Sequence, residues 1–125
     1  MANLVLTINL TEDNVPVPNF PIIARLNPST AMPLDGVPVA AVNNTSSFVT
    51  VPGVINLTTQ LQCLVLTPDQ LVNLEFNGNS YLPLPAGAVL VLFGTNISGT
   101  IATLATVNNP AASVASNLYG LVAGV

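Results

Sequence analysis

The sequence predicts an all-β fold, a single antiparallel β-sandwich or jelly roll of about 8–9 short strands spanning residues 1–125. Apolar residues alternate with a period of two, which is typical of strands, and no window shows the 3.6-residue period of an amphipathic helix. Turn signals recur about every 8 to 12 residues, and most of the 11 prolines and 8 glycines lie in them. A chain of this length fits one domain.

Residues 1–21 are predicted to form an N-terminal strand followed by a proline-rich arm. Leu4, Leu6 and Ile8 alternate with polar or smaller residues up to position 10, as in a half-buried strand. The following segment, 11–21, carries three prolines, which cannot donate hydrogen bonds to a sheet, so we expect a loop or an extended arm there. Such an arm could reach a neighbouring molecule and add a strand to its sheet.

The middle of the chain reads as short strands separated by turns. Asp35 and Gly36 predict a turn, and Pro38 places the strand after it at a sheet edge, because proline lacks a ladder donor. The expected strands here are 22–26, 37–42, 48–51 and 54–58.

The second half repeats this pattern. Asn77 and Gly78 tolerate positive φ angles, so they predict a type I′ hairpin turn. Pro68 followed by Asp69 reads as a turn, and the start of a short helix is the alternative. The expected strands are 61–67, 71–76, 80–84, 88–93, 101–107 and 118–122.

Charge is scarce, and this excludes several classes of partner. Charged residues make up 5% of the chain, against about 25% in ordinary soluble domains. Arg25 is the only cation, and the net charge is −4. We therefore expect no binding to nucleic acid or to an anionic membrane, since both require several basic residues. No run approaches the roughly 20 apolar residues of a membrane span, and the first ten residues lack the basic start of a signal peptide.

Candidate catalytic and metal-binding groups are few. There is no histidine, so neither a Ser-His-Asp nor a Cys-His arrangement can form. Cys63 is the single cysteine and lies in an apolar run, where we expect a buried thiol. Glu12, Asp13 and Asn14 form the one cluster of oxygen ligands, which we interpret as a solvated loop rather than a calcium site. We predict no enzymatic activity, no cofactor and no metal.

Two predicted strands are apolar on both faces. Residues 88–93 and 61–66 do not alternate, although a strand of a two-layer sandwich needs only one apolar face. The outer face of such a strand must be covered either by the chain's own loops or by another subunit. We favour another subunit and predict a stable homo-oligomer. Its interface, or an interface with a capsid, is assigned to Leu64, Leu66, Val89, Val91, Phe93 and Tyr81.

Three segments of the C-terminal third resemble small β-rich virion proteins of tailed bacteriophages. They are LPLPAG at 82–87, LFGT at 92–95 and TVNNP at 106–110. The resemblance implies a capsid decoration (cement) protein that trimerises and clamps neighbouring major capsid subunits on the head. It also implies a protein made in the host cytoplasm and located on the virion surface. The alternative is a receptor- or glycan-binding module of a fibre or tail, with Tyr81 as the aromatic best placed to stack on a sugar.

Overall fold

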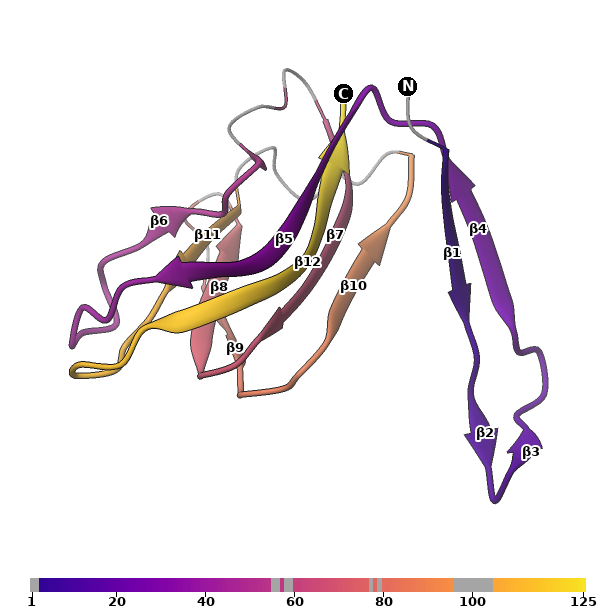
Figure 1. Cartoon of the computed structure of the whole chain (residues 1–125), viewed down its shortest axis with the longest axis horizontal. Helices are drawn as coiled ribbons and strands as arrows, with labels where there is room; N and C mark the ends of the chain where they lie inside the picture. The colour runs from indigo at the N-terminus through magenta and orange to yellow at the C-terminus, as the bar shows by residue number, and fades with distance from the viewer. Residues whose placement is uncertain (1–2, 55–56, 58–59, 77, 79, 96–104) are drawn as a thin grey trace.

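The computed structural model describes residues 3–54, 57, 60–76, 78, 80–95 and 105–125, and strands dominate them (Figure 1). Two four-stranded antiparallel sheets pack face to face and confirm the predicted all-β sandwich. The first sheet has the order β10-β7-β12-β5, with bounds Leu90–Phe93, Leu61–Pro68, Ser116–Gly124 and Thr30–Val39. The second sheet has the order β6-β11-β8-β9, with bounds Val49–Thr50, Ala105–Asn108, Val72–Phe76 and Leu82–Leu84.

The eight strands of the two sheets pair in a nested order. The first, β5, pairs with the last, β12; β6 pairs with β11, β7 with β10 and β8 with β9. Two further pairings, β12 with β7 and β11 with β8, complete the sheets. This nesting is what results when a long antiparallel ribbon folds across itself, and it defines a jelly roll.

The core lies between the sheets and follows the period-two pattern. Leu64 and Leu66 of β7 and Leu118 and Val122 of β12 point from the first sheet toward the second. The second sheet contributes Val72, Leu74, Ala105 and Val107, and all of these side chains are buried. Because burial of each such side chain contributes roughly 1.5–3 kcal/mol, this layer is the main source of the fold's stability.

Strand β5 departs from the sequence-based expectation. The pairing with β12 jumps from Val37–Leu118 to Asp35–Tyr119, so Gly36 is an extra residue in the ladder, with a φ of 69°. Asp35 and Gly36 therefore form a β-bulge inside one long strand, and the predicted turn is wrong. A glycine with positive φ serves either structure, and only the pairing of its neighbours distinguishes them. The edge position predicted from Pro38 is confirmed.

Buried asparagines fasten the loops at one end of the sandwich. The amide of Asn108 donates to the carbonyls of Asn44 and Ser47 at 3.0 and 2.9 Å, and its oxygen accepts from Asn73 at 3.0 Å. The amide of Asn109 donates to the carbonyls of Val39, at the end of β5, and of Val114 at 2.9 and 2.8 Å. These buried amides replace charged residues as the polar fasteners of the fold.

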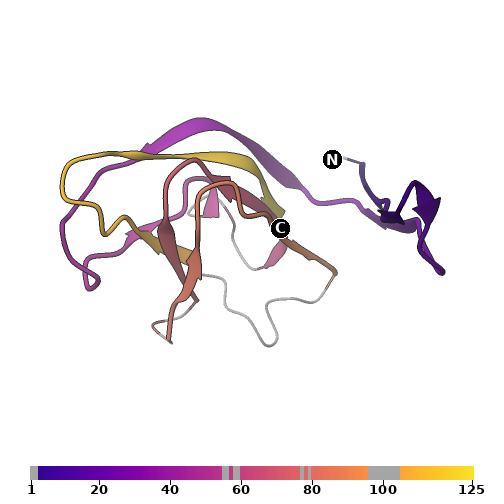
Figure 2. The ribbon, with the colours of Figure 1, turned by 90° about the horizontal axis from the view of Figure 1, so that it is seen from below.

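Residues 4–26 form a two-stranded arm that projects away from the sandwich (Figures 1 and 2). β1 (Leu4–Ile8) pairs with β4 (Ile22–Leu26), and β2 (Thr11–Glu12) pairs with β3 (Val15–Pro16). Asp13 and Asn14 make the turn at the tip, with φ values of 51° and 65°. The proline-rich segment is therefore largely the distal half of a hairpin rather than a loop, and the strand predicted at 22–26 is the return strand.

Some predicted elements lie outside the described residues. They are most of the strand at 54–58, the first position of the turn at Asn77 and Gly78, and residues 101–104 of the last strand but one. Within the described part of the chain, no helix is long and apolar enough to cross a membrane.

Candidate interaction surfaces

The first sheet has an outer face that the second sheet does not cover. Side chains alternate along a strand, so the neighbours of Leu64 and Leu66 on β7 point outward. Val65 lies opposite Val91 of β10 on one side and opposite Leu121 of β12 on the other. We call this surface the outer face; it consists of Val91, Phe93, Cys63, Val65, Thr67, Tyr119, Leu121, Ala123, Ala31, Pro33 and Asp35.

The structure separates the residues predicted for the interface into two groups. Leu64 and Leu66 are 0% exposed and belong to the core between the sheets, which corrects their assignment to an interface. Val89 is 67% exposed and Val91 is 36% exposed, while Phe93 is half-buried. On β7 the residues that face outward are Cys63 and Val65, because side chains alternate along the strand and the two leucines face the core.

The base of the arm covers one end of the outer face. Leu26, Cys63 and Ala123 are buried in a second apolar cluster, distinct from the core, against which Leu4, Val65, Phe93 and Leu121 pack. Burial raises the pKa of the Cys63 thiol. The expectation of a buried cysteine is confirmed. The chain therefore covers this end of the outer face with its own arm. Beyond the arm base, Val91 and Tyr119 remain exposed.

The arm carries an apolar face of its own. Pairing places Leu4 opposite Leu26, Leu6 opposite Ala24 and Ile8 opposite Ile22, so these six side chains share one side of the ribbon. We call this side the arm face; it contains no polar or charged side chain along β1 and β4. The other side carries Val5, Arg25, Thr7 and Ile23. Of the arm face, Leu4 and Leu26 pack against the sandwich cluster, and Ile22 near the distal end is exposed.

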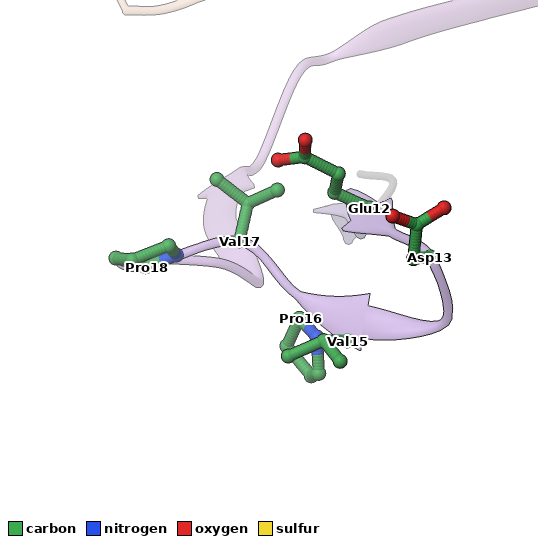
Figure 3. A pocket seen from close by; sticks show the side chains of 6 residues that line it. All are labelled: Glu12, Asp13, Val15, Pro16, Val17 and Pro18. Carbon is green, nitrogen blue, oxygen red and sulfur yellow. The ribbon is translucent and has the colours of Figure 1, made fainter.

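A shallow pocket of about 310 Å³ lies at the tip of the arm (Figure 3). Glu12, Asp13, Val15, Pro16, Val17 and Pro18 line it. The carboxylates of Glu12 and Asp13 point away from Val15 and Pro16 instead of converging on a common point. Across the described residues, no three His, Cys, Asp or Glu side chains gather to hold a metal ion. Glu12, Asp13 and Asn14 are all exposed, as expected of a solvated loop.

Asp69, an acidic residue of the sandwich, has a structural role. Asp69 follows β7 and accepts hydrogen bonds from the backbone N–H of Asn117 at 2.7 Å and from its side-chain amide at 2.8 Å. These two hydrogen bonds hold the pKa of Asp69 below its ordinary value, and the bond from the backbone N–H has the larger effect. The carboxylate thus ties the end of β7 to β12 rather than facing a pocket.

Tyr81 is the remaining residue of the predicted interface. Its side chain is 42% exposed, and its ring lies 6.1 Å from that of Phe48, at an interplanar angle of 40°. Phe48 therefore supports one part of the tyrosine ring while another part stays open to solvent. Tyr81 belongs to the loop before β9, away from the strands of the first sheet.

Comparison with known proteins gives no relative: no protein family, no curated protein and no solved structure matches the chain. The surfaces above therefore have to be interpreted from their own chemistry. Local sequence patterns did not point to Val65, Tyr119 and Leu121 of the outer face. They also did not point to the side chains of the arm face, among them Leu6, Ile8, Ile22 and Ala24. Period-two alternation could have identified the residues of the outer face, because they lie one position away from the residues that face the core.

Proposed function

We propose that this chain is a non-enzymatic structural protein of a virion that acts as a homo-oligomer on the surface of an assembled bacteriophage head. The observation that carries the proposal is the apolar surface that stays open on parts of the outer face and the arm face, where Val91, Tyr119 and Ile22 are exposed. Soluble monomers rarely expose contiguous apolar patches, and interface centres are depleted of charge. A chain with one cation and five acids has few means other than apolar contact to recognise a partner.

Two further features support a decoration role. The nested strand order is that of the jelly roll, an architecture used by viral capsid and lectin domains, although this is an analogy of fold and not of site. A protein that binds only the assembled lattice stabilises that lattice by mass action, and joining several copies in one oligomer adds avidity. The partners under this proposal are further copies of the chain, in a homotrimer, and the major capsid protein.

The test is a binding comparison between assembled phage shells and free coat subunits of the same phage. We expect the protein to co-sediment with shells and not with free subunits. Val91→Asp on the outer face should reduce shell binding at least tenfold, whereas Val114→Asp, an exposed valine in a loop, should leave it unchanged. Equal binding to shells and free subunits, or none to either, would contradict the proposal.

A receptor- or glycan-binding module of a fibre or tail is the second candidate, and the exposed ring of Tyr81 supports it. Sugars stack on exposed aromatic rings, and lectins also use the jelly roll. A glycan array gives the decision: specific binding that Tyr81→Ala abolishes would favour this candidate over the first. Immunoelectron microscopy that places the protein on the tail would do the same.

A further inference from the structure

We propose that the outer face carries a saccharide-binding site centred on the ring of Tyr119, beyond the end that the arm base covers. The inference rests on the glycan-binding candidate of the proposed function and gives it a site other than Tyr81. Tyr119 of β12 lies opposite Asp35 of β5 on one side and opposite Thr67 of β7 on the other. Because directly opposed residues of a sheet share a face, the three side chains form one row across the outer face.

The bulge at Gly36 makes room for the tyrosine ring. A Cβ atom at this glycine would lie 3.4 Å from the hydroxyl oxygen of Tyr119 and 3.6 and 3.7 Å from its Cε1 and Cζ atoms. The ring therefore leans toward β5 and rests against the glycine, while 41% of the residue stays exposed. A tyrosine has only two side-chain torsions, so a ring supported in this way loses little conformational entropy when a ligand stacks on it.

The polar groups around the ring are free to bind a ligand. Within the described part of the chain, no hydrogen bond or ion pair involves the carboxylate of Asp35 or the hydroxyls of Thr67 and Tyr119. Asp69 of the same sheet differs, because Asn117 donates two hydrogen bonds to its carboxylate. The row thus combines an exposed aromatic ring with one carboxylate and two hydroxyls that the sandwich does not use.

A neutral ligand with many hydroxyl groups uses all of these features. The row spans two strand spacings, about 10 Å, so one sugar ring stacked on Tyr119 brings hydroxyls near both Asp35 and Thr67. An anion is disfavoured, because the chain's only cation, Arg25, lies on the arm. An apolar ligand would leave the carboxylate desolvated and unpaired. A basic side chain of a partner protein suits the ring and the carboxylate but leaves Thr67 unused.

The openness of the site sets its strength. Tight small-molecule sites are concave and bury most of their ligand, whereas this row lies on the open side of a sheet. We therefore expect weak binding of a single sugar, at millimolar concentration. Several copies joined in one oligomer would bind a surface that displays many glycans far more tightly.

Saturation-transfer NMR with methyl glycosides of neutral hexoses and N-acetylhexosamines tests the site on the full chain. We expect transfer to the C–H groups of at least one sugar. Tyr119→Ala should weaken its binding about tenfold and Tyr119→Phe less, because the phenylalanine keeps the ring. Asp35→Asn should weaken binding by about threefold to tenfold through its hydrogen bonds. Asp13→Asn removes the same charge at the arm tip and should leave binding unchanged. Circular dichroism checks the fold of each variant.

The outcomes separate this inference from the functions on which it rests. Sugar binding that Tyr81→Ala abolishes and Tyr119→Ala leaves intact overturns the site but keeps a glycan-binding protein. Absence of binding to every glycoside in the unchanged chain overturns the site together with that candidate. Binding of N-acetylarginine amide in place of sugars, lost in Asp35→Asn, overturns the saccharide in favour of a basic protein partner. Co-sedimentation with shells tests the virion role separately.

Discussion

The two faces of strand β7 have similar composition and different fates. Leu64 and Leu66 point inward and are fully buried by the second sheet of the same chain. Cys63 and Val65 point outward, where the arm base covers the first and leaves the second only half-buried. An apolar side chain on a strand therefore specifies that something must cover it, and the topology decides whether that cover is the same molecule. We expect the inner face to govern folding and the outer face to govern association.

Truncation of the two faces should give the largest contrast. Leu64→Ala opens a cavity in a fully packed layer, and we expect a loss of about 2–5 kcal/mol in the free energy of unfolding. Val65→Ala, on the next residue, should cost about 1 kcal/mol or less, because its side chain is only half-buried. Urea denaturation followed by circular dichroism measures both. Equal losses would break the comparison.

The thermal midpoint should depend on protein concentration. If the outer face is buried between copies, association stabilises the folded state by mass action, and a hundredfold rise in concentration should raise Tm by about 5 °C. Val91→Asp should remove this dependence without unfolding the chain, because its side chain lies on the outer face and is exposed in the single chain. A midpoint of the unchanged chain that stays constant with concentration would show that the outer face remains bare.

The thiol of Cys63 reports on the cover supplied by the arm. Cys63 is 1% exposed because the cluster with Leu26 closes over it. Leu26→Ala should open that cluster, return the raised pKa of the thiol toward its ordinary value and speed its reaction with a thiol reagent at least tenfold. Ile23→Ala, on the other side of the ribbon, is the control and should leave the rate unchanged. Slow labelling of Leu26→Ala would mean that other residues bury the thiol.

The smallest effect concerns Asp69 at the rim of the first sheet. Hydrogen bonds from Asn117 lower its pKa in the folded state, so the carboxylate adds stability above its ordinary pKa, and this is lost as pH falls through the lowered value. Asp69→Asn should therefore lower Tm slightly near neutral pH, and the two proteins should converge once the pH falls below the lowered pKa of Asp69. Melting curves between neutral and strongly acidic pH measure this. Sedimentation of Asp69→Asn should be unchanged, since the residue lies outside the outer face.

The fold class could be predicted from the sequence, because alternation and turn residues are local signals. The predicted strands at 22–26, 61–67, 71–76, 88–93 and 118–122 each overlap an observed strand. The return of the arm was missed because its prolines masked the turn at Asp13 and Asn14, and the bulge at Gly36 was missed because a ladder register depends on a distant strand. The two surfaces needed the pairing of β1 with β4 and of β7 with β12, which no local pattern contains.

Sedimentation velocity of the unchanged chain over a range of micromolar concentrations tests the central claim most directly, namely that its uncovered apolar surfaces are built to be covered by another molecule of the same kind. We expect a species of several chains that dissociates on dilution. A single species of 12.8 kDa at every concentration would contradict this account.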